Sequence, residues 1–340
     1  MRGAAALAVV SLLAPAAPHA RGAGPGDPLQ PKQWALAQLH AERAWAVTTG
    51  KGVLVAVVDS GTDANHPDLR GAVLPGRDML TGRPGQKDGC GHGTEVAGVI
   101  AARRGNGRGI VGIAPSARIL PLKVGDCVDV DGTAVVAAIR YAVAQGVKVI
   151  NLSHATIPLT GQASAAVGLQ DALQAAVDEA WSRGVLVVAS AGNLAVPLCT
   201  YPGLARRALC VGAVDRAERR TYYSEGSSVG TDGFLVAPGG GPTLTPDDGI
   251  WTTTVSAPAD SGDVSTGEPP PFPGYAEVQG TSYAAPYVSG VAALLFSRGL
   301  SVQEVRTRLL STARDLGAPG SDVVYGAGLI DAPAALAGRR

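Results

Sequence analysis

Five short apolar runs constrain the fold of this chain most strongly, because helix-length segments lie among them. The runs occupy 53–58, 118–124, 147–152, 185–189 and 209–214. The first is rich in β-branched residues, as strands buried on both faces are. Helical patterns at 133–145 and 165–183 end at Gly146 and Gly184, where helices usually stop. This alternation implies right-handed crossovers, so the sequence predicts a three-layer α/β fold, a mostly parallel β-sheet with helices on both faces.

Two later segments complete the predicted architecture. Ser301 and Glu304 have the spacing of a capping box, which predicts a helix that runs to about Thr312. Residues 239–273 are crowded with Gly, Pro, Ser and Asp, which predicts a long surface loop over most of them. One large domain over 34–335 is favoured, because the candidate catalytic residues described below span most of that range.

The first twenty residues have the pattern of a secretory signal. Arg2 supplies a positive charge, 4–13 an apolar run too short for a bilayer, and 14–20 the small side chains of a cleavage site. A disordered Ala-rich terminus or an uncleaved anchor is the alternative. We expect a secreted protein, extracellular or periplasmic, with no membrane span after signal cleavage. The following residues, 21–33, are assigned to an extended arm because they are rich in Gly and Pro.

The charge composition excludes one class of partner. Charged residues are 16% of the chain and the formal net charge is zero, so the sequence lacks the basic footprint of a nucleic-acid-binding protein.

The cysteines are expected to form disulfides. The four cysteines, Cys90, Cys127, Cys199 and Cys210, allow three pairings, and the export signal favours disulfides over thiols. Proximity along the chain favours Cys199 with Cys210, which leaves Cys90 with Cys127. We treat this pairing as a hypothesis.

Polar residues follow three of the predicted strands. Asp59 follows the first run, Ser153 the third and Gly192-Asn193 the fourth. The carboxyl ends of parallel strands meet at one edge of a sheet, where α/β proteins place their sites. The turn Asp59-Ser60-Gly61 lacks the G-x-G-x-x-G pattern of a dinucleotide site, and the chain has no G-K-[ST] phosphate loop. The sequence therefore predicts a shared crevice that does not bind nucleotides.

A histidine and a serine are the remaining candidates for chemistry in this crevice. His92, in Gly91-His92-Gly93-Thr94, begins a helical pattern whose small neighbours leave the imidazole accessible. Ser282 precedes the apolar segment 288–296, so it stands at the start of a predicted buried helix, where free N–H groups stabilise an oxyanion. Alone, such a serine would be interpreted as an ordinary N-cap. His154, next to Ser153, is a candidate pocket residue.

Together, Asp59-Ser60-Gly61, Gly91-His92-Gly93-Thr94 and Gly280-Thr281-Ser282 resemble the signature motifs of the subtilisin-like serine peptidases, the subtilase family or peptidase family S8. The chain order Asp, His, Ser is also that of the family. The resemblance implies a serine endopeptidase that hydrolyses peptide bonds through an acyl-enzyme. Ser282 would be the nucleophile, His92 the proton carrier and Asp59 the residue that orients His92. Asn193 corresponds to the family's oxyanion-hole asparagine.

The chain departs from the family pattern at its substrate strand. In family members the sequence of this strand is usually Ser-Leu-Gly-Gly or similar, whereas in this chain it is Ser153-His154-Ala155-Thr156. The resemblance implies that Ser153, His154, Ala155 and Gly192 contact the substrate, although Ala155 carries a Cβ that the family's glycine lacks. Glu95 replaces a frequent histidine, and we expect that change to matter little.

One subfamily, the mycosins, shares three further features with this chain. Only about 30 residues separate the signal from the first strand, so we expect no folded propeptide, and mycosins also lack one. They carry a cysteine just before the catalytic histidine, as Cys90 does here, and a similar doubled alanine, Ala284-Ala285. Mycosins normally end in a transmembrane helix, whereas this chain ends at 335–340 without one.

The resemblance implies no required cofactor, with calcium as the one candidate ion. Asp27 and Asp68 stand where family members with the first calcium site place ligands, and Asn106 lies in the corresponding loop, but Arg103 and Arg104 argue against a cation there. We expect a monomer that acts on a peptide or protein substrate and binds no nucleic acid. Two other functions stay open, a catalytically silent subtilase-fold binding or scaffold protein and an esterase.

Overall fold

The computed structural model describes residues 26–127, 129–154, 163–227, 233–242, 247–255 and 272–337. The signal predicted at 1–20 and the start of the arm predicted at 21–33 lie outside these residues, and so does Ala155. Within the described part of this arm, Gln30–Lys32 form a short 3₁₀-helix, η1, so the prediction of an extended segment is wrong there.

Seven strands form one parallel sheet in the order β2-β3-β1-β4-β5-β6-β7. They are β1 (Leu54–Asp59), β2 (Arg77–Asp78), β3 (Arg118–Lys123), β4 (Val149–Leu152), β5 (Leu186–Ser190), β6 (Leu209–Val214) and β7 (Phe234–Pro238). The five apolar runs of the sequence correspond to β1, β3, β4, β5 and β6. The α/β prediction is therefore confirmed, although it missed β2 and β7.

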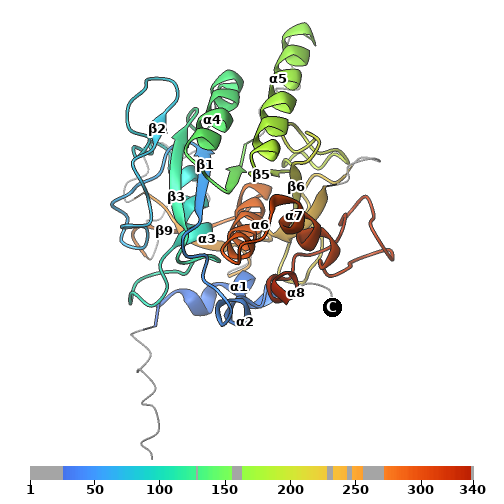
Figure 1. Cartoon of the computed structure of the whole chain (residues 1–340). Helices are drawn as coiled ribbons and strands as arrows, with labels where there is room; N and C mark the ends of the chain where they lie inside the picture. The colour runs from blue at the N-terminus through green and yellow to red at the C-terminus, as the bar shows by residue number, and fades with distance from the viewer. Residues whose placement is uncertain are drawn as a thin grey trace, which may run out of the picture.

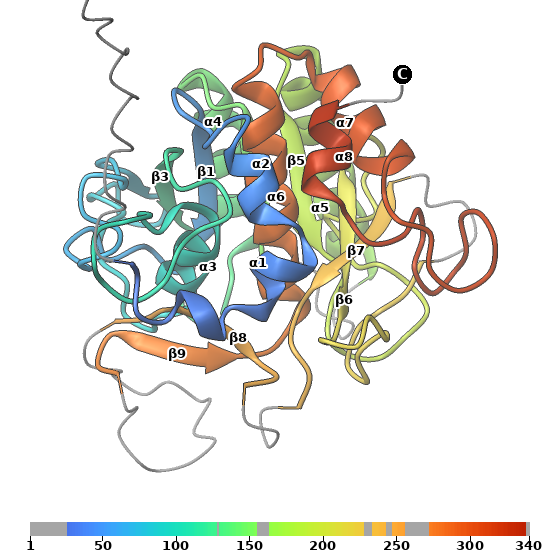
Figure 2. The ribbon, with the colours of Figure 1, turned by 90° about the horizontal axis from the view of Figure 1, so that it is seen from below.

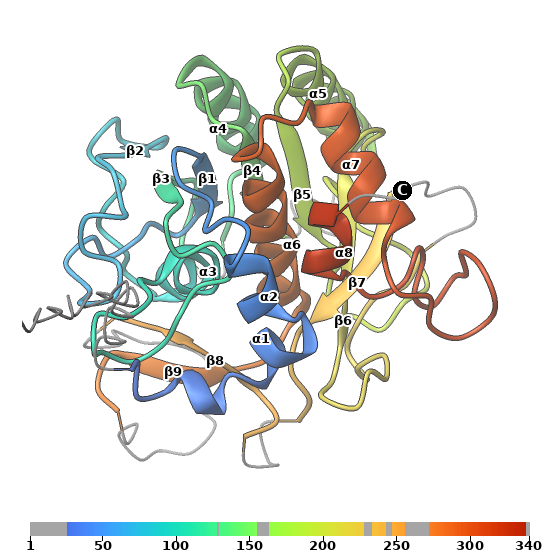
Figure 3. The same ribbon diagram turned by 60° about the horizontal axis from the view of Figure 1, so that its bottom comes forward.

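Helices cover both faces of this sheet, as Figure 1 shows: α4 and α5 lie together on one face, and α3 and α6 lie on the other. The helices are α1 (Trp34–Gln38), α2 (Ala41–Trp45), α3 (His92–Ala101), α4 (Gly132–Ala144), α5 (Ala163–Ser182), α6 (Thr281–Phe296), α7 (Val302–Ser311) and α8 (Ala332–Ala337). The N-terminus of α7 carries the capping box expected from Ser301 and Glu304. Figure 3 shows α7 and α8 near α6 on the face opposite α4 and α5.

The β1 strand shows why this sequence requires three layers. Val55 and Val57 pack with α3 and α6, whereas Ala56 and Val58 pack with α4 and α5. All four side chains are at most 1% exposed. Successive side chains of a strand point to opposite faces of the sheet. When the side chains on both faces are apolar, each face must be covered by a layer of helices.

The position of β1 between β3 and β4 creates the switch point of the sheet. The chain passes from β1 towards β3 on one side, and it later passes from β4 towards β5 on the other. The register pairs Val58 with Leu152, so Asp59 and Ser153 follow as neighbours at the carboxyl ends of the two strands. Ligand sites of doubly wound sheets lie at such a point.

The surface-loop prediction for residues 239–273 was wrong at 250–253. These residues form β8 (Ile250–Thr253), a buried strand that pairs antiparallel with β9 (Tyr275–Val278) and lies beside α3 in Figure 2. Hydroxyl groups fix β8 on the helix, because Thr252 Oγ1 donates to the Glu95 carbonyl and Thr253 Oγ1 to the Thr94 carbonyl. Gly- and Pro-rich composition does not reveal such a contact, which depends on a helix distant in sequence.

Two disulfides restrain the loops around the carboxyl ends of the strands. Cys90 is bonded to Cys127, and Cys199 to Cys210, which is the pairing favoured by proximity along the chain. The first bond joins the segment before α3 to the segment after β3. The second joins β6 to the loop that follows β5.

Gly93 allows α3 to approach β1 closely. A Cβ on this residue would collide with the backbone oxygen of Gly61 and lie 3.1 Å from the Asp59 Cβ. By contrast, Gly168 in α5 is exposed, and a Cβ there would have nothing within 4 Å. Glycine is therefore needed at 93 for close packing but not at 168.

We expect Gly93→Ala to lower the free energy of unfolding by about 1–3 kcal/mol, since an added methyl group forces the backbone of α3 away from β1. Gly168→Ala is the matched control and is expected to stabilise by up to about 1 kcal/mol, because alanine is the better helix former. Urea unfolding in a Ser282→Ala background, which prevents self-digestion, measures both. Equal stabilities for the two variants would contradict the packing argument.

Candidate active site

Asp59 and His92 lie face to face across the gap between β1 and α3. Asp59, the last residue of β1, is fully buried, and His92 is the first residue of α3. His92 Nδ1 lies 2.8 Å from Asp59 Oδ1, and the Ser60 backbone N–H donates to the same oxygen at 2.8 Å. Gly91, the N-cap of α3, has φ +102°, which suits glycine, and the chain turns there so that His92 faces β1.

Burial and neighbouring charges determine the protonation of this pair. Burial alone would raise the pKa of Asp59, but the charges of His154 and His92 outweigh it and hold that pKa well below its usual range. Burial likewise lowers the pKa of His92, yet Asp59, aided by Glu95 and Asp88, raises the His92 pKa above that of an ordinary histidine. Asp59 is therefore ionised at neutral pH, and it makes His92 a stronger base.

Ser282 lies in the first turn of α6, where Pro286 determines how its backbone is held. Proline has no N–H, so the Ser282 carbonyl, four residues earlier, receives no helical hydrogen bond. Ser153 Oγ donates to that carbonyl at 2.8 Å instead. The Ser282 hydroxyl donates to the Ser153 backbone oxygen, also at 2.8 Å. These two bonds tie the start of α6 to the end of β4.

A short buried network orients Ser153. The Asn151 side-chain amide donates to Ser153 Oγ at 2.8 Å, and Ser289 Oγ donates to Asn151 Oδ1 at 2.7 Å. Asn151 and Ser289 are fully buried. Because Asn151 lies on β4 and Ser289 on α6, the network sets the position of the helix relative to the strand.

Asn193 has its amide group oriented by α6. The backbone N–H and the hydroxyl of Thr281 both donate to Asn193 Oδ1, at 3.0 and 2.8 Å. These donors identify the oxygen, so Nδ2 is directed away from Thr281. Asn193 is exposed, and its Nδ2 is available to donate to a ligand. Gly280 borders this amide, and its φ of +149° is a backbone conformation that suits glycine.

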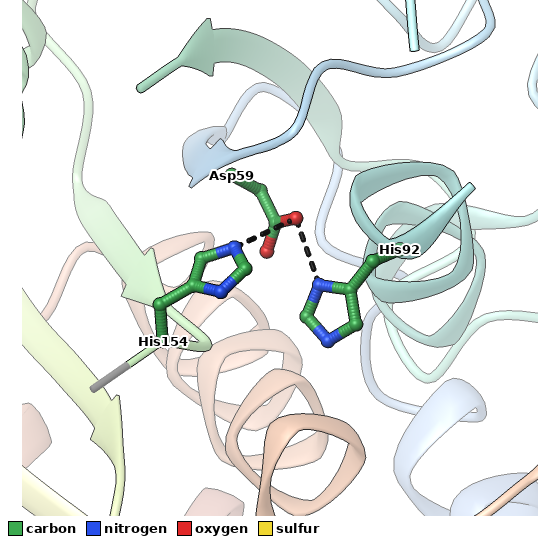
Figure 4. Close-up of side chains that lie close together, drawn as sticks. All are labelled: Asp59, His92 and His154. Atoms are coloured by element: carbon green, nitrogen blue, oxygen red, sulfur yellow. Dashed lines mark hydrogen bonds and ion pairs between the residues drawn. The ribbon is translucent and has the colours of Figure 1, made fainter. Parts of the chain in front are cut away.

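His154, a candidate pocket residue from its sequence position, lies against Asp59. Its Nε2 is 3.0 Å from Asp59 Oδ1, the oxygen that His92 also contacts, and Figure 4 shows the two rings on either side of the carboxylate. The ring centroids of His92 and His154 are 4.8 Å apart. The close approach of Nε2 is not matched by a well-aligned N–H, so the attraction is chiefly electrostatic. The strand register could have revealed this contact, because Ser153 is the neighbour of Asp59.

Asp59, His92 and His154 each have one atom that could bind a metal ion, and these three atoms lie within 4.8 Å of one another. A transition metal would suit this spacing. On His92 Nδ1, however, a metal would replace the 2.8 Å contact with Asp59. We therefore interpret the cluster as one that handles a proton.

Ser153 and Gly192 follow β4 and β5, so their backbones border the same crevice from neighbouring strands. The Gly192 N–H donates to Thr281 Oγ1 at 3.2 Å. Gly192 has φ +119°, and a Cβ there would collide with the Glu225 side chain. A glycine is thus required at this position next to Asn193.

Two carboxyl groups matter more than the sequence suggested. Glu95, expected to have little effect, accepts hydrogen bonds from Tyr283 Oη at 2.6 Å and Thr254 Oγ1 at 3.0 Å, and so links α3 to α6 and to the segment after β8. Burial raises the pKa of Glu95. Glu225 was missed altogether, since it sits in a polar run with no periodicity. It is fully buried behind Gly192, and its Oε2 has no hydrogen-bond partner among the described residues.

The candidate calcium residues are engaged with N–H donors. The Asp27 carboxylate accepts from the backbone N–H groups of residues 105–107 at 2.7–3.2 Å. Asp68 accepts from the Asn106 side-chain amide at 2.8 Å and from the Ile110 N–H at 3.0 Å. A hard cation needs several free oxygen ligands, and here those oxygens bind donors instead. The arrangement does not fit calcium.

A buried carboxylate that orients an imidazole, a serine at a helix N-terminus and an oriented asparagine amide, all at the switch point of a parallel sheet, define a serine hydrolase site. The subtilase family model matches residues 50–328. Thermitase from Thermoactinomyces vulgaris is 35% identical over 303 residues, covering 87% of this chain and 94% of that protein. Subtilisin BL from Lederbergia lenta is 35% identical over 309 residues, covering 89% and 97%.

Solved structures give the same relationship. The crystal structure of a lanthipeptide protease superposes with a TM-score of 0.78 at 32% identity, covering 90% of this chain and 94% of that one. The chain belongs to the subtilase family and is a subtilisin-like serine-type endopeptidase. Within the described residues, none of the helices combines the length and apolarity needed to cross a bilayer.

Glu225 generates a pH-dependent prediction. Burial raises the pKa of its carboxyl to about 7, against 4.5 for an ordinary glutamate. The folded state therefore favours the protonated form, so the associated stability is fully present below pH 4.5 and is lost as the pH rises through 7. We expect Glu225→Gln, measured by Tm in a Ser282→Ala background, to match its parent at pH 4 and to exceed it at pH 8. A Tm difference that is the same at both pH values would contradict this reasoning.

Proposed function

We propose that the chain is a secreted endopeptidase in which Ser282, His92, Asp59 and Asn193 act together through an acyl-enzyme. The observation that carries the proposal is the contact between His92 Nδ1 and Asp59 Oδ1. This contact engages one ring nitrogen and leaves Nε2 as the base for a serine hydroxyl. Family membership supports the same assignment.

In the proposed reaction, Ser282 turns its hydroxyl from the Ser153 carbonyl towards His92 when substrate binds. Catalytic hydrogen bonds often form only in the substrate complex. The Oγ–H bond breaks, its proton passes to His92 Nε2, and Oγ bonds to the substrate carbonyl carbon. The carbon–nitrogen bond then breaks, and His92 returns the proton to the leaving amine. Water repeats the sequence and releases the acid product from Ser282.

Two donors are proposed to stabilise the oxyanion, the Asn193 side-chain amide and the Ser282 backbone N–H. The orientation of Asn193 by Thr281 supports this role, because it directs the amide N–H groups away from α6. Ser282 lies in the first turn of its helix, so its N–H has no intrahelical partner. A preorganised donor needs no reorientation as negative charge develops.

The substrate is proposed to lie in extended form along the segments after β4 and β5. Ser153, Ala155 and Gly192 would pair with its backbone, and the specificity of the enzyme would depend on the side chains around them. The protein is proposed to act as a monomer. We also propose that it is exported by the signal at 1–20, that the arm at 21–33 follows, and that the peptidase domain occupies 34–335. The two disulfides support an oxidising compartment.

The proposed enzyme needs no calcium at Asp27, Asp68 and Asn106. The Asp27 carboxylate accepts from the N–H groups of residues 105–107, which ties the arm to this loop, and the Asn106 amide donates to Asp68. No other cofactor is required for the proposed reaction.

The nucleophile is tested with a fluorophosphonate probe. We expect the wild-type protein to be labelled at Ser282 and to cleave a quenched peptide library, because an activated serine attacks both reagents. Ser282→Ala should lose both activities while keeping its fold by circular dichroism. Ser116→Ala, which removes an exposed hydroxyl just before β3 and outside the site, is the control and should still be labelled. Labelling of Ser282→Ala would refute the assignment.

The oxyanion donor is tested separately. Asn193→Ala is expected to lower kcat by roughly 100- to 1,000-fold with little change in KM, since the donor acts mainly on charge that develops in the transition state. Asn193→Asp should lose as much, because a carboxylate cannot donate the hydrogen bond and repels the oxyanion. Steady-state kinetics on one cleaved peptide gives both constants. An unchanged kcat in Asn193→Ala would exclude the role.

A further inference from the structure

One oxygen atom of Asp59 is shared by two imidazoles. His92 Nδ1 lies 2.8 Å from Oδ1, and His154 Nε2 lies 3.0 Å from it, on the other side of the carboxylate (Figure 4). The side chains are poorly exposed, at 17% for His92, 13% for His154 and 0% for Asp59. Because little water screens them, a change in the charge or proton of one affects the other two strongly.

The other groups around His92 are mostly acidic. They are Asp59 at the end of β1, Asp88 before α3, Glu95 one turn along α3, Tyr283 from α6 with its ring 5.6 Å away, and His154 after β4. Lys123 on β3 has its ammonium group bound to the carbonyls of Ser60 and Gly125 and to Asp126. Among these described groups, His154 is the one that lies against the same Asp59 oxygen as His92.

A second imidazole next to Asp59 reduces the stabilisation of protonated His92 in two ways. His154 lies against the same oxygen as His92, so its N–H dipole or charge offsets part of the negative potential of Oδ1. The His92 imidazolium is then stabilised less by Asp59. A proton on His154 also repels a proton on His92, since the rings are 4.8 Å apart. Both effects act in the same direction, towards neutral His92.

We propose that His154 is a positioning residue, which shares Asp59 with His92, keeps His92 neutral at lower pH than Asp59 alone would allow, and so extends proteolysis towards acid. The inference rests on the proposed function, because only neutral His92 can accept the Ser282 proton. His154 acts through Asp59, and the leucine usual at this position in the family has no group that could do the same.

The test is the pH dependence of kcat/KM on one peptide for the whole protein and its His154 variants, in buffers that contain EDTA. His154→Leu is expected to move the acid limb of the profile up by about one pH unit. At a fixed pH on that limb, kcat/KM should fall about tenfold, because each unit changes the neutral fraction tenfold. The alkaline plateau should be retained, since His92 is neutral there in both proteins.

Two further variants separate charge from other effects. His154→Gln keeps a polar side chain that cannot become a cation, so its acid limb should move in the same direction by less. His40→Leu is the matched control, because His40 pairs with Asp331 far along the chain and contacts neither Asp59 nor His92. Its acid limb should coincide with that of the wild type.

A direct readout comes from NMR titration of the His92 ring in Ser282→Ala and in Ser282→Ala/His154→Leu. The imidazolium is expected to persist to higher pH in the double variant. An unmoved titration or acid limb would overturn the inference, as would a loss of kcat/KM that is equal at every pH, which indicates a merely structural role. If His154→Leu fails to fold, His154→Gln decides the matter by the same criteria.

The failure of this inference is distinguishable from failure of the proposed function. If Ser282→Ala retains peptidase activity, the catalytic assignment itself is wrong. If Ser282→Ala is inactive while the acid limb is the same with and without His154, the assignment stands and the role of His154 is excluded.

Discussion

The buried carboxylate of Asp59 is the interaction on which the rest of the site depends. It is wholly enclosed by the fold, and an isolated carboxylate in such a place would be strongly destabilising. The Ser60 N–H and two imidazoles, those of His92 and His154, compensate for its burial. The requirement is mutual: the carboxylate needs partners, and it fixes the side chains that approach it.

The sheet makes this arrangement possible because β1 and β4 are neighbours at its switch point. Asp59 and His154 follow these two strands, so their meeting is a consequence of register. Ser282, the proposed nucleophile, is attached to the same strands through α6, where the lack of an N–H at Pro286 leaves the Ser282 carbonyl for Ser153 Oγ. The Ser282 carbonyl, which has no partner four residues later in α6, thus forms the hydrogen bond that connects this helix to the end of β4. The strand β4, the helix α6 and the Asp59 carboxylate are held relative to one another by hydrogen bonds as well as by apolar packing.

Much of the fold could be predicted from apolar periodicity, and the elements that escaped prediction show its limit. β1 and β5 were recognisable because both faces of each strand are buried, which requires a run of apolar residues such as 55–58 and 186–189. β8 escaped because its burial relies on threonine hydroxyls that bond to carbonyls of α3. Glu225 escaped because a buried carboxyl group without periodic neighbours has no signature in the sequence. Polar burial depends on partners that are distant along the chain.

The sequence by itself determined the family, the α/β class and the residues in the three motifs, because each of these follows from residue types at short spacing. Only the tertiary structure decided what His154 contacts, how Asn193 is oriented and whether Asp27, Asp68 and Asn106 have oxygens free for a cation. The physical reason is the range of the forces involved. Periodicity and turn chemistry are local, whereas a hydrogen bond or a charge contact acts over about 3 Å between segments that only the folded chain brings together.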